Sequence, residues 1–331
     1  MMNSIKFELI FFYKMADQNN IFLGVHVGKK NNINGDVRET LTTAIKQDID
    51  AVGFNAAQIF THGPRSYKQN KYNINEVLNT TADIHLSVHS AYFTTGIWKA
   101  RAQAISLLKA QLAACREISA KYLIIHLTKT TPEAIADIMH AHILPMAQEY
   151  KITIALEMPA CKVNKKSPNL TYETPEKLFN LTKTIGKHKY YGYCIDTAHL
   201  WGAGVNIKYY NDFANWLNVF DALYNGIYKT TNKQHKNKGR RRRRRTLIKM
   251  FHLNGSSAAL GSGKDKHEIP GGTLDNIWRD VPFEQSGIKA LIKYAMANKC
   301  PVINEINRGE PNDYNDYLKK INTLIKDVSM F

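Results

Sequence analysis

Short apolar runs alternate with longer helical segments along the 331-residue chain, and this alternation constrains the fold more than any other feature. In the helical segments Leu, Ile and Ala recur at three- and four-residue intervals, as in Ile97 to Ala120, Pro132 to Glu149 and Thr174 to Ile185. The apolar runs predict eight β-strands: Ile21 to Val27, Ala56 to Thr61, Ile84 to Ser90, Tyr122 to Leu127, Ile152 to Met158, Tyr191 to Thr197, Leu247 to Asn254 and Pro301 to Asn307.

Eight βα units in about 300 residues match a (β/α)8 TIM barrel, an α/β fold with its active site at the C-terminal ends of the strands. A doubly wound open sheet is the alternative, but no G-x-G-x-x-G follows the first strand and no Walker loop is present. We expect one barrel domain over residues 21–331. The N-terminal extension of residues 1–20 should be dispensable, because Met15 could equally start the chain.

The composition excludes several classes of protein. With 44% hydrophobic and 22% charged residues, the chain is globular rather than disordered, collagen-like or coiled-coil. No apolar run approaches the roughly 18 residues of a membrane span, and the N-terminus does not match a signal peptide. We therefore expect a soluble, intracellular monomer, cytoplasmic or nuclear, without a membrane partner. The four cysteines form no C-x-x-C pair, which argues against disulfides or a thiolate zinc site.

Basic residues are in large excess, with a formal net charge of +17. Such an excess suggests a polyanionic partner, with nucleic acid first and an anionic membrane second. Four lysines, six consecutive arginines and no acid fall in one segment, Lys229 to Arg245. We expect this segment to be a disordered insertion, because like charges repel and it has little apolar surface to bury. It is either a solvated insertion without a specific partner, or a phosphate-binding or nuclear-localisation-like patch.

Metal-capable side chains end six successive predicted strands, from the third to the eighth. They are His89, His126, Glu157, Asp196, His252 and Glu305. His199 follows the sixth strand, and Asp265 and His267 lie in the loop after the seventh. In a TIM barrel these positions meet at one end. Nine nitrogen and oxygen donors suit zinc or manganese and are too many for one ion, so we expect a cluster of two or three.

Each of these residues alone is more often structural than functional. Buried carboxylates are costly unless they are paired or metal-bound, however, and Glu157 and Asp196 lie in apolar sequence. Hydrolysis at phosphorus needs several divalent ions close together, because one acidifies a water while others neutralise phosphate oxygens. Together with the basic charge, the residues favour a nucleic-acid hydrolase.

The sequence also resembles the endonuclease IV family of apurinic/apyrimidinic endonucleases. The resemblance runs from LGVHVG at Leu23 to about Asn307 and includes IDTAHLWGAG, FHLNG, KDKHEIPGG and INEIN. It implies a TIM barrel of the xylose-isomerase-like type that cleaves duplex DNA on the 5′ side of an abasic site, leaving a 3′-hydroxyl and a 5′-deoxyribose phosphate. The family also trims blocked 3′ ends.

The resemblance implies three zinc ions, with manganese possible at one or more sites. One would be held by His89, His126 and Glu157, a second by Glu157 as a bridge with Asp196, His252 and Glu305, and a third by His199, Asp265 and His267. Glu157 and Glu305 would be the catalytic carboxylates, Glu305 beside the attacking hydroxide as an orienting or proton-accepting group.

Three further positions match the family's DNA-reading elements. Arg65 falls where the family places an arginine at the lesion, and Tyr92 and Phe93 fall where it places stacking or wedging side chains. An abasic nucleotide is easily extruded, and an aromatic or cationic group can fill the gap. His26 is also present in the family, but we expect no ligand role for it. Gly255 departs from the family, which usually has an acid there.

Two alternatives remain from the sequence. A metal-dependent sugar isomerase or epimerase on the same barrel would also gather His, Asp and Glu at strand ends, but it would not need the Asp265-x-His267 pair or the basic insertion. A catalytically silent nucleic-acid-binding protein would have no use for nine clustered metal donors.

Overall fold

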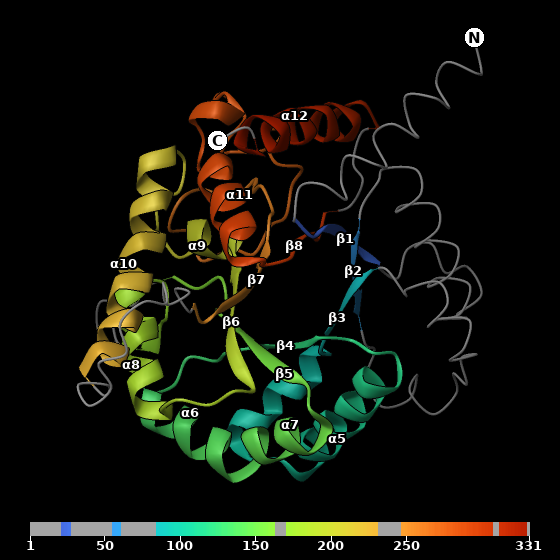
Figure 1. The fold of residues 1–331 in the computed structure, drawn as a ribbon, viewed down its shortest axis with the longest axis vertical. Coiled ribbons are helices and arrows are strands. Elements are labelled where there is room, and N and C mark those ends of the chain that lie inside the picture. The colour runs from blue at the N-terminus through green and yellow to red at the C-terminus, as the bar shows by residue number, and fades with distance from the viewer. Residues whose placement is uncertain are drawn as a thin grey trace, which may run out of the picture.

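Eight parallel strands form a closed barrel in the computed structural model, which describes residues 21–27, 55–60, 84–162, 170–230, 246–306 and 311–329. Each strand pairs with the next in sequence order, and the eighth pairs with the first (Figure 1). The predicted TIM barrel is therefore confirmed. The strands are β1 (Leu23–Val27), β2 (Ala56–Phe60), β3 (His85–His89), β4 (Tyr122–His126), β5 (Thr153–Glu157), β6 (Tyr191–Asp196), β7 (Ile248–His252) and β8 (Val302–Asn304).

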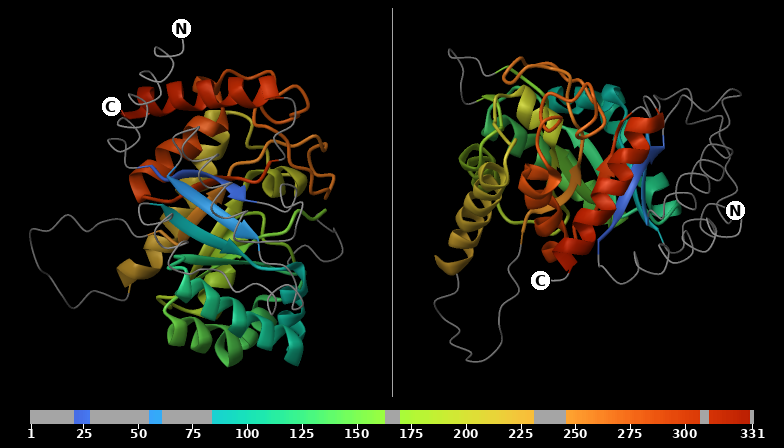
Figure 2. Two further views of the ribbon diagram at one scale, coloured as in Figure 1. Left: turned by 90° about the vertical axis from the view of Figure 1, so that its right-hand side faces the viewer. Right: turned by 90° about the horizontal axis from the view of Figure 1, so that it is seen from above.

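Helices surround the barrel on the outside (Figure 2). They are α5 (Ala102–Glu117), α6 (Pro132–Ile138), α7 (Leu144–Tyr150), α8 (Pro175–Ile185), α9 (Thr197–Gly202), α10 (Tyr210–Thr230), α11 (Gly287–Asn298) and α12 (Pro311–Ser329). Thr131 and Thr174 cap α6 and α8, each accepting a backbone N–H three residues later and each followed by a proline. These are typical helix starts, since both devices satisfy or remove unpaired donors of the first turn.

Two predicted helices differ from the structure in their details. The segment from Ile97 to Ala120 is not one helix: a 3₁₀ helix spans Tyr92–Lys99, Ala100 adopts a left-handed conformation with φ of 51°, and only then does α5 begin. The segment from Pro132 to Glu149 is helical throughout, but a π-helical turn, Met139–Ile143, separates α6 from α7.

The barrel interior holds its own small apolar layer, separate from the larger core between strands and helices. The interior layer consists of Ala56, Ile124, Ala155, Cys194, Met250 and Ile303, all fully buried. Because side chains alternate along a strand, the next inward position is two residues further along. Those positions are Gln58, His126, Glu157, Asp196, His252 and Glu305. The interior therefore changes from apolar to polar at the carboxyl ends of the strands, as the sequence predicts.

The basic segment connects two described elements at the opposite end of the barrel. Residues 231–245 lie outside the described residues, but α10 ends before them and β7 begins shortly after them. Since His252 is the last residue of β7, this connection joins the barrel at the amino-terminal end of the strand. The predicted extension of residues 1–20 also lies outside the described residues. No helix in the described part of the chain has the length and apolarity to cross a membrane.

Candidate metal centre

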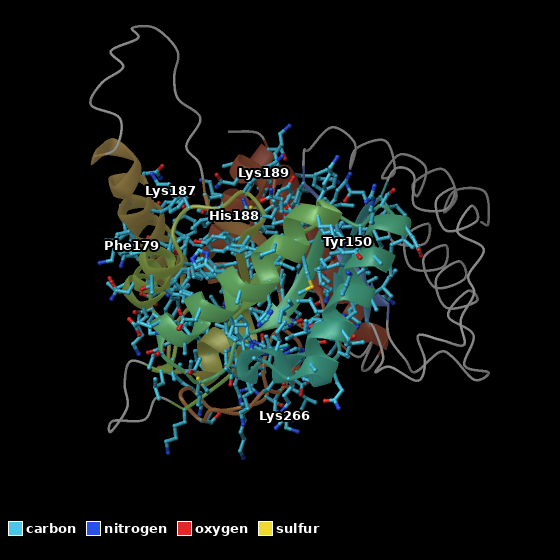
Figure 3. All side chains as sticks on the ribbon, turned by 90° about the horizontal axis from the view of Figure 1, so that it is seen from below. Tyr150, Phe179, Lys187, His188, Lys189 and Lys266 are labelled. Atoms are coloured by element: carbon cyan, nitrogen blue, oxygen red, sulfur yellow. The ribbon has the colours of Figure 1, made fainter. Side chains whose placement is uncertain are left out.

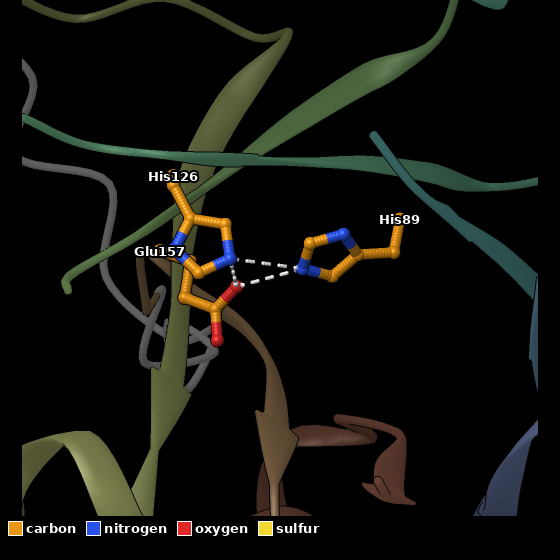
Figure 4. A group of neighbouring side chains, drawn as sticks. All are labelled: His89, His126 and Glu157. Carbon is orange, nitrogen blue, oxygen red and sulfur yellow. Dashed lines mark hydrogen bonds and ion pairs between the residues drawn. The ribbon is translucent and has the colours of Figure 1, made fainter. Parts of the chain in front are cut away.

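Glu157 at the end of β5 lies between His89 and His126 from the two preceding strands (Figure 4). Its Oε2 atom is 3.2 Å from His89 Nε2 and 3.4 Å from His126 Nε2. The two histidine Nε2 atoms are themselves 3.2 Å apart. Two imidazole nitrogens and one carboxylate oxygen at this spacing form a donor set suited to one divalent ion.

The other oxygen of Glu157 faces a second group of donors. Glu157 Oε1 is 2.8 Å from His252 Nδ1, and the same nitrogen is 3.0 Å from Glu305 Oε2 and 3.6 Å from Asp196 Oδ2. Donor atoms of these four residues lie within 4.8 Å of one another. Glu157 thus has one oxygen in each group, which is the arrangement that a carboxylate bridging two ions requires.

A third group forms where β6 passes into α9. Asp196 caps this helix by accepting the His199 backbone N–H at 2.9 Å, which places both side chains at the same end of the barrel. His199 Nε2 and His267 Nε2 lie 3.3 Å and 2.8 Å from Asp265 Oδ1. All nine donors predicted from the sequence are therefore brought together at one end of the barrel.

Orphaned nitrogens show that this donor set fits metal ions. His199 Nδ1 lies 2.7 Å from the Met158 carbonyl oxygen and His267 Nδ1 lies 3.4 Å from that of Glu305. If each Nδ1 donates to its carbonyl, Nε2 carries a lone pair. Both Nε2 atoms are buried, and although each lies near Asp265 Oδ1, neither makes a well-aligned hydrogen bond with a described residue. A buried acceptor without a partner is costly, and a bound cation would satisfy it.

Two carboxylates of the centre, those of Glu157 and Asp265, have lowered pKa values. Burial raises the pKa of Glu157, but His252 and His126 outweigh burial and hold it well below its ordinary value. In the same way, His199 and His267 overcome burial and lower the pKa of Asp265. Ionised carboxylates are the form that binds metal. The same contacts raise the pKa values of His199, His252 and His267, so a bound cation would have to displace protons from these imidazoles.

Gln58 is a buried contact of the centre that the sequence analysis missed. Its Oε1 lies 2.8 Å from His252 Nε2, and its Nε2 donates to Glu305 Oε1 at 2.5 Å. The same Nε2 is 2.9 Å from Nδ1 of His26, which itself is 3.2 Å from Glu305. A signal was available, because Gln58 follows Ala56 by two residues, just as Glu157 follows Ala155.

Asn254, which the sequence analysis also missed, hydrogen-bonds to both Asp196 and Glu305. Its side-chain amide donates to Asp196 Oδ2 at 2.7 Å, and its Oδ1 accepts the Glu305 backbone N–H at 2.8 Å. The residue has no exposed surface. Asn254 therefore fixes the relative positions of the ends of β6 and β8.

The position of Gly255 is sterically closed to a larger residue. A Cβ atom there would lie 2.7 Å from Asp275 Cγ. The buried Asp275 carboxylate accepts four backbone N–H groups, those of Ser256, Gly271, Ile277 and Trp278, and so shapes the loop that carries Asp265 and His267.

Of the three predicted DNA-reading residues, only Tyr92 can be placed with its side chain. Its ring is 63% exposed and lies 5.5 Å from that of His126, at the rim of a cavity of about 190 Å³ that the metal donors line. Arg65 and the side chain of Phe93 lie outside the described residues. An exposed aromatic ring beside the centre is suited to stacking on a ligand.

The fold and the site together define a TIM barrel with clustered His, Asp and Glu side chains that could bind metal at the carboxyl ends of its strands. The chain belongs to the xylose isomerase-like TIM barrel family, whose family model matches residues 47–317. It is 28% identical over 266 residues to a probable AP endonuclease of African swine fever virus, covering 77% of this chain and 80% of that one.

Two further proteins extend the comparison. A probable endonuclease 4 of Thermosipho melanesiensis is 26% identical over 299 residues, covering 85% of this chain and 93% of that one. The crystal structure of AsfvAP:AG has the same fold, with a TM-score of 0.69 and 24% identity over 94% of this chain and 98% of that one. The resemblance seen in the sequence is thus confirmed at the level of the family.

Proposed function

We propose that this protein is a DNA repair endonuclease that hydrolyses the phosphodiester on the 5′ side of an abasic site in duplex DNA. The observation that carries the proposal is the clustering of nine donors at one end of the barrel, where Glu157 belongs to the first two groups and Asp196 lies beside His199 and His267 of the third. Support comes from the relatives named AP endonuclease and endonuclease 4, and from the net charge of +17, which suits a polyanionic substrate.

The three groups would hold three divalent ions, zinc by resemblance, with manganese as the alternative. Ions bound there would supply positive charge for the phosphate oxygens and the leaving alkoxide and would lower the pKa of a water molecule. Hydrogen bonds from neighbouring groups would hold the metal-binding side chains in place. Gln58 contacts His252, Asn254 contacts Asp196, and a backbone carbonyl lies at Nδ1 of His199.

Glu305 is the residue best placed to handle a proton. Its side chain is 11% exposed, whereas Glu157 and Asp196 have no exposed surface, so Glu305 is the carboxylate of the second group that substrate and water can reach. Its pKa is held below the ordinary value, mainly by His252, against the effect of burial. An ionised carboxylate at the rim can orient a water molecule and accept its proton.

Recognition of the lesion would depend on the rim of the centre. An abasic nucleotide has no base to stack, so extruding it costs little, and the exposed ring of Tyr92 can stack beside it. Arg65 and Phe93 are proposed to fill the gap in the duplex. The same centre would also accept a blocked 3′ end, because that phosphodiester presents the same oxygens.

The third donor group argues against a sugar isomerase. Isomerases of this fold typically use two ions. The cluster of His199, Asp265 and His267 would then have no metal to bind, although grouping such polar side chains is costly without one.

The test is incision of a duplex oligonucleotide with one tetrahydrofuran abasic analogue, before and after prolonged chelation. We expect a nick 5′ to the analogue that chelation abolishes and zinc restores. Absence of a nick by folded, zinc-loaded protein would overturn the proposal, and cleavage of the undamaged duplex at equal rate would refute the role of the rim residues.

A further inference from the structure

A second cavity lies at the amino-terminal end of the barrel, which we call the barrel-foot cavity. It has a volume of about 910 Å³ and lies between α10, α11 and the starts of β6 and β7. Figure 3 shows Lys187 and Lys189, which line it, at the opposite end of the molecule from Lys266 in the loop of the metal centre. The cavity is therefore separate from the proposed active site, and nothing in the proposed reaction uses it.

The described lining of the barrel-foot cavity is strongly basic. Five lysines and one histidine contribute to it: Lys187, His188, Lys189, Lys249, Lys293 and Lys299. Asp221 is the one acid among the described residues of the lining, and it already accepts the Tyr294 hydroxyl at 2.8 Å. Converging cations in a concave site raise the local potential and favour an anionic ligand.

Lys249 gives the strongest indication that an anion binds in this cavity. It lies where the pairing of β6 and β7 is interrupted between Tyr193 and Cys194, and its stem crosses Gly192. A Cβ at Gly192 would lie 2.3 Å from the Leu247 carbonyl oxygen and 2.5 Å from Lys249 Cγ, so the glycine allows the close approach of the β7 backbone and also leaves room for the lysine stem. The lysine is half-buried, and burial lowers the pKa of its amine. No described carboxylate lies within ion-pair distance of it, and a buried cation without a counter-ion is unfavourable.

The size and walls of the cavity indicate what kind of anion fits. A volume of about 910 Å³ is within the range of small-molecule sites. Tyr122, Tyr191 and Tyr210 give it aromatic surface beside the lysines. Lysine ammonium groups bind phosphate well, and aromatic rings suit a base or sugar attached to it.

We propose that the barrel-foot cavity binds a phosphate group, carried either by a free nucleotide or by the backbone of a nucleic acid. Lys249 contacts the phosphate from inside the cavity, and Lys299 and Lys187 contact it from the rim. The site is a binding site and not a second catalytic centre, because no metal donors line it apart from His188, Asp221 and Cys300 among the described residues.

Calorimetric titration of the zinc-loaded, full-length protein with adenosine 5′-monophosphate tests this site. We expect Lys249→Met to weaken binding at least tenfold and Lys299→Gln at least threefold. Lys109→Met, which removes an exposed lysine of α5 outside the cavity, should leave Kd unchanged. Incision at the abasic analogue should be unchanged in all three variants, which separates this site from the proposed active site.

Equal binding of the nucleotide by wild type, Lys249→Met and Lys299→Gln would overturn the proposal, as would the absence of binding. If Lys249→Met does not fold, Lys299→Gln decides alone, because Lys299 is exposed. An undamaged duplex distinguishes the two sources of phosphate. If duplex binding is weakened by Lys299→Gln and the nucleotide displaces the duplex, the phosphate belongs to a nucleic acid. If neither Lys299→Gln nor the nucleotide affects duplex binding, the phosphate belongs to a free nucleotide.

Discussion

Glu157 has no exposed surface and directs its two carboxylate oxygens to different groups of donors. Glu157→Gln keeps the shape but replaces one oxygen by an amide that cannot bind a cation. We expect at least a hundredfold loss of incision and a loss of bound metal, measured by elemental analysis of the purified variant. Glu117→Gln on the exposed side of α5 is the control. A folded Glu157→Gln variant with normal metal content would contradict the bridging role.

Gln58 decides which nitrogen of His252 is available to an ion. Its Oε1 is 2.8 Å from His252 Nε2, so the proton stays on Nε2 and Nδ1 faces the carboxylates. Gln58→Leu should weaken metal affinity about 10- to 100-fold in competition with a chelator. Gln58→Glu, which retains an acceptor, should lose less.

Gln111→Leu is the matched control for Gln58→Leu, since Gln111 is equally buried but hydrogen-bonds to Thr94 away from the centre. Equal metal affinity in Gln58→Leu and wild type would show that His252 needs no such partner.

Seven of the nine donors could be picked out from the sequence because each is a His, Asp or Glu at or within three residues of a strand end, whereas Asp265 and His267 lie in the loop after β7. Gln58 and Asn254 were missed, because amides are rarely sought as parts of a metal site. Their roles depend on which strands are neighbours, and that is visible only once the barrel closes. The assignments of Arg65 and Phe93 to DNA stay predictions.

At the level of elements, all eight strands were predicted, with ends that coincide or differ by up to three residues. Apolar residues continue beyond the hydrogen-bonded ladder, so the pattern overestimates strand length, most of all for β8. The predicted helix start at Ile97 was wrong for a similar reason. Helical spacing of apolar residues continues through the 3₁₀ helix, and the left-handed residue at Ala100 leaves no trace in that spacing.

Gly24 in β1 is required by the closeness of the neighbouring strand. A Cβ there would lie within 2.0 Å of the Ala56 carbonyl oxygen, which is backbone and cannot move aside. We expect Gly24→Ala to lower the free energy of unfolding by about 3 kcal/mol or more. Denaturant titration of metal-free protein measures this without the contribution of ligand binding.

Gly226→Ala gives the opposite expectation. Gly226 is an exposed residue of α10 with nothing within 4 Å of its added Cβ. Alanine should therefore raise the free energy of unfolding by about 1 kcal/mol through helix propensity. Similar effects of the two substitutions would mean that the barrel relaxes around Gly24.

For the whole molecule, the metal-capable donors and the connection from α10 to β7 lie at opposite ends of the barrel. The metal donors lie at the carboxyl ends of the strands, and the connection that contains residues 231–245 joins at the other end. The basic segment could be recognised in the sequence, but its position along the chain does not show which end of the barrel it joins. The strand order of the structure shows this, because the segment leads from a helix into the start of β7.

Replacing the lysines and arginines of residues 231–245 by serine should therefore affect binding more than chemistry. We expect weaker binding to undamaged duplex and a smaller slope of log K against log salt, because fewer counterions are released. The incision rate at saturating substrate should change less than twofold. An unchanged salt slope would return this segment to the reading of a solvated insertion without a partner.

The donors of the metal centre come from six strands, and β8, which precedes Glu305, completes the ring by pairing with β1. A chain whose barrel is still open therefore cannot present the full donor set, even where its helices have already formed. The second donor group in particular stays incomplete until β8 has joined the barrel, because Glu305 directly follows this strand. Full metal loading would therefore report that the barrel has closed.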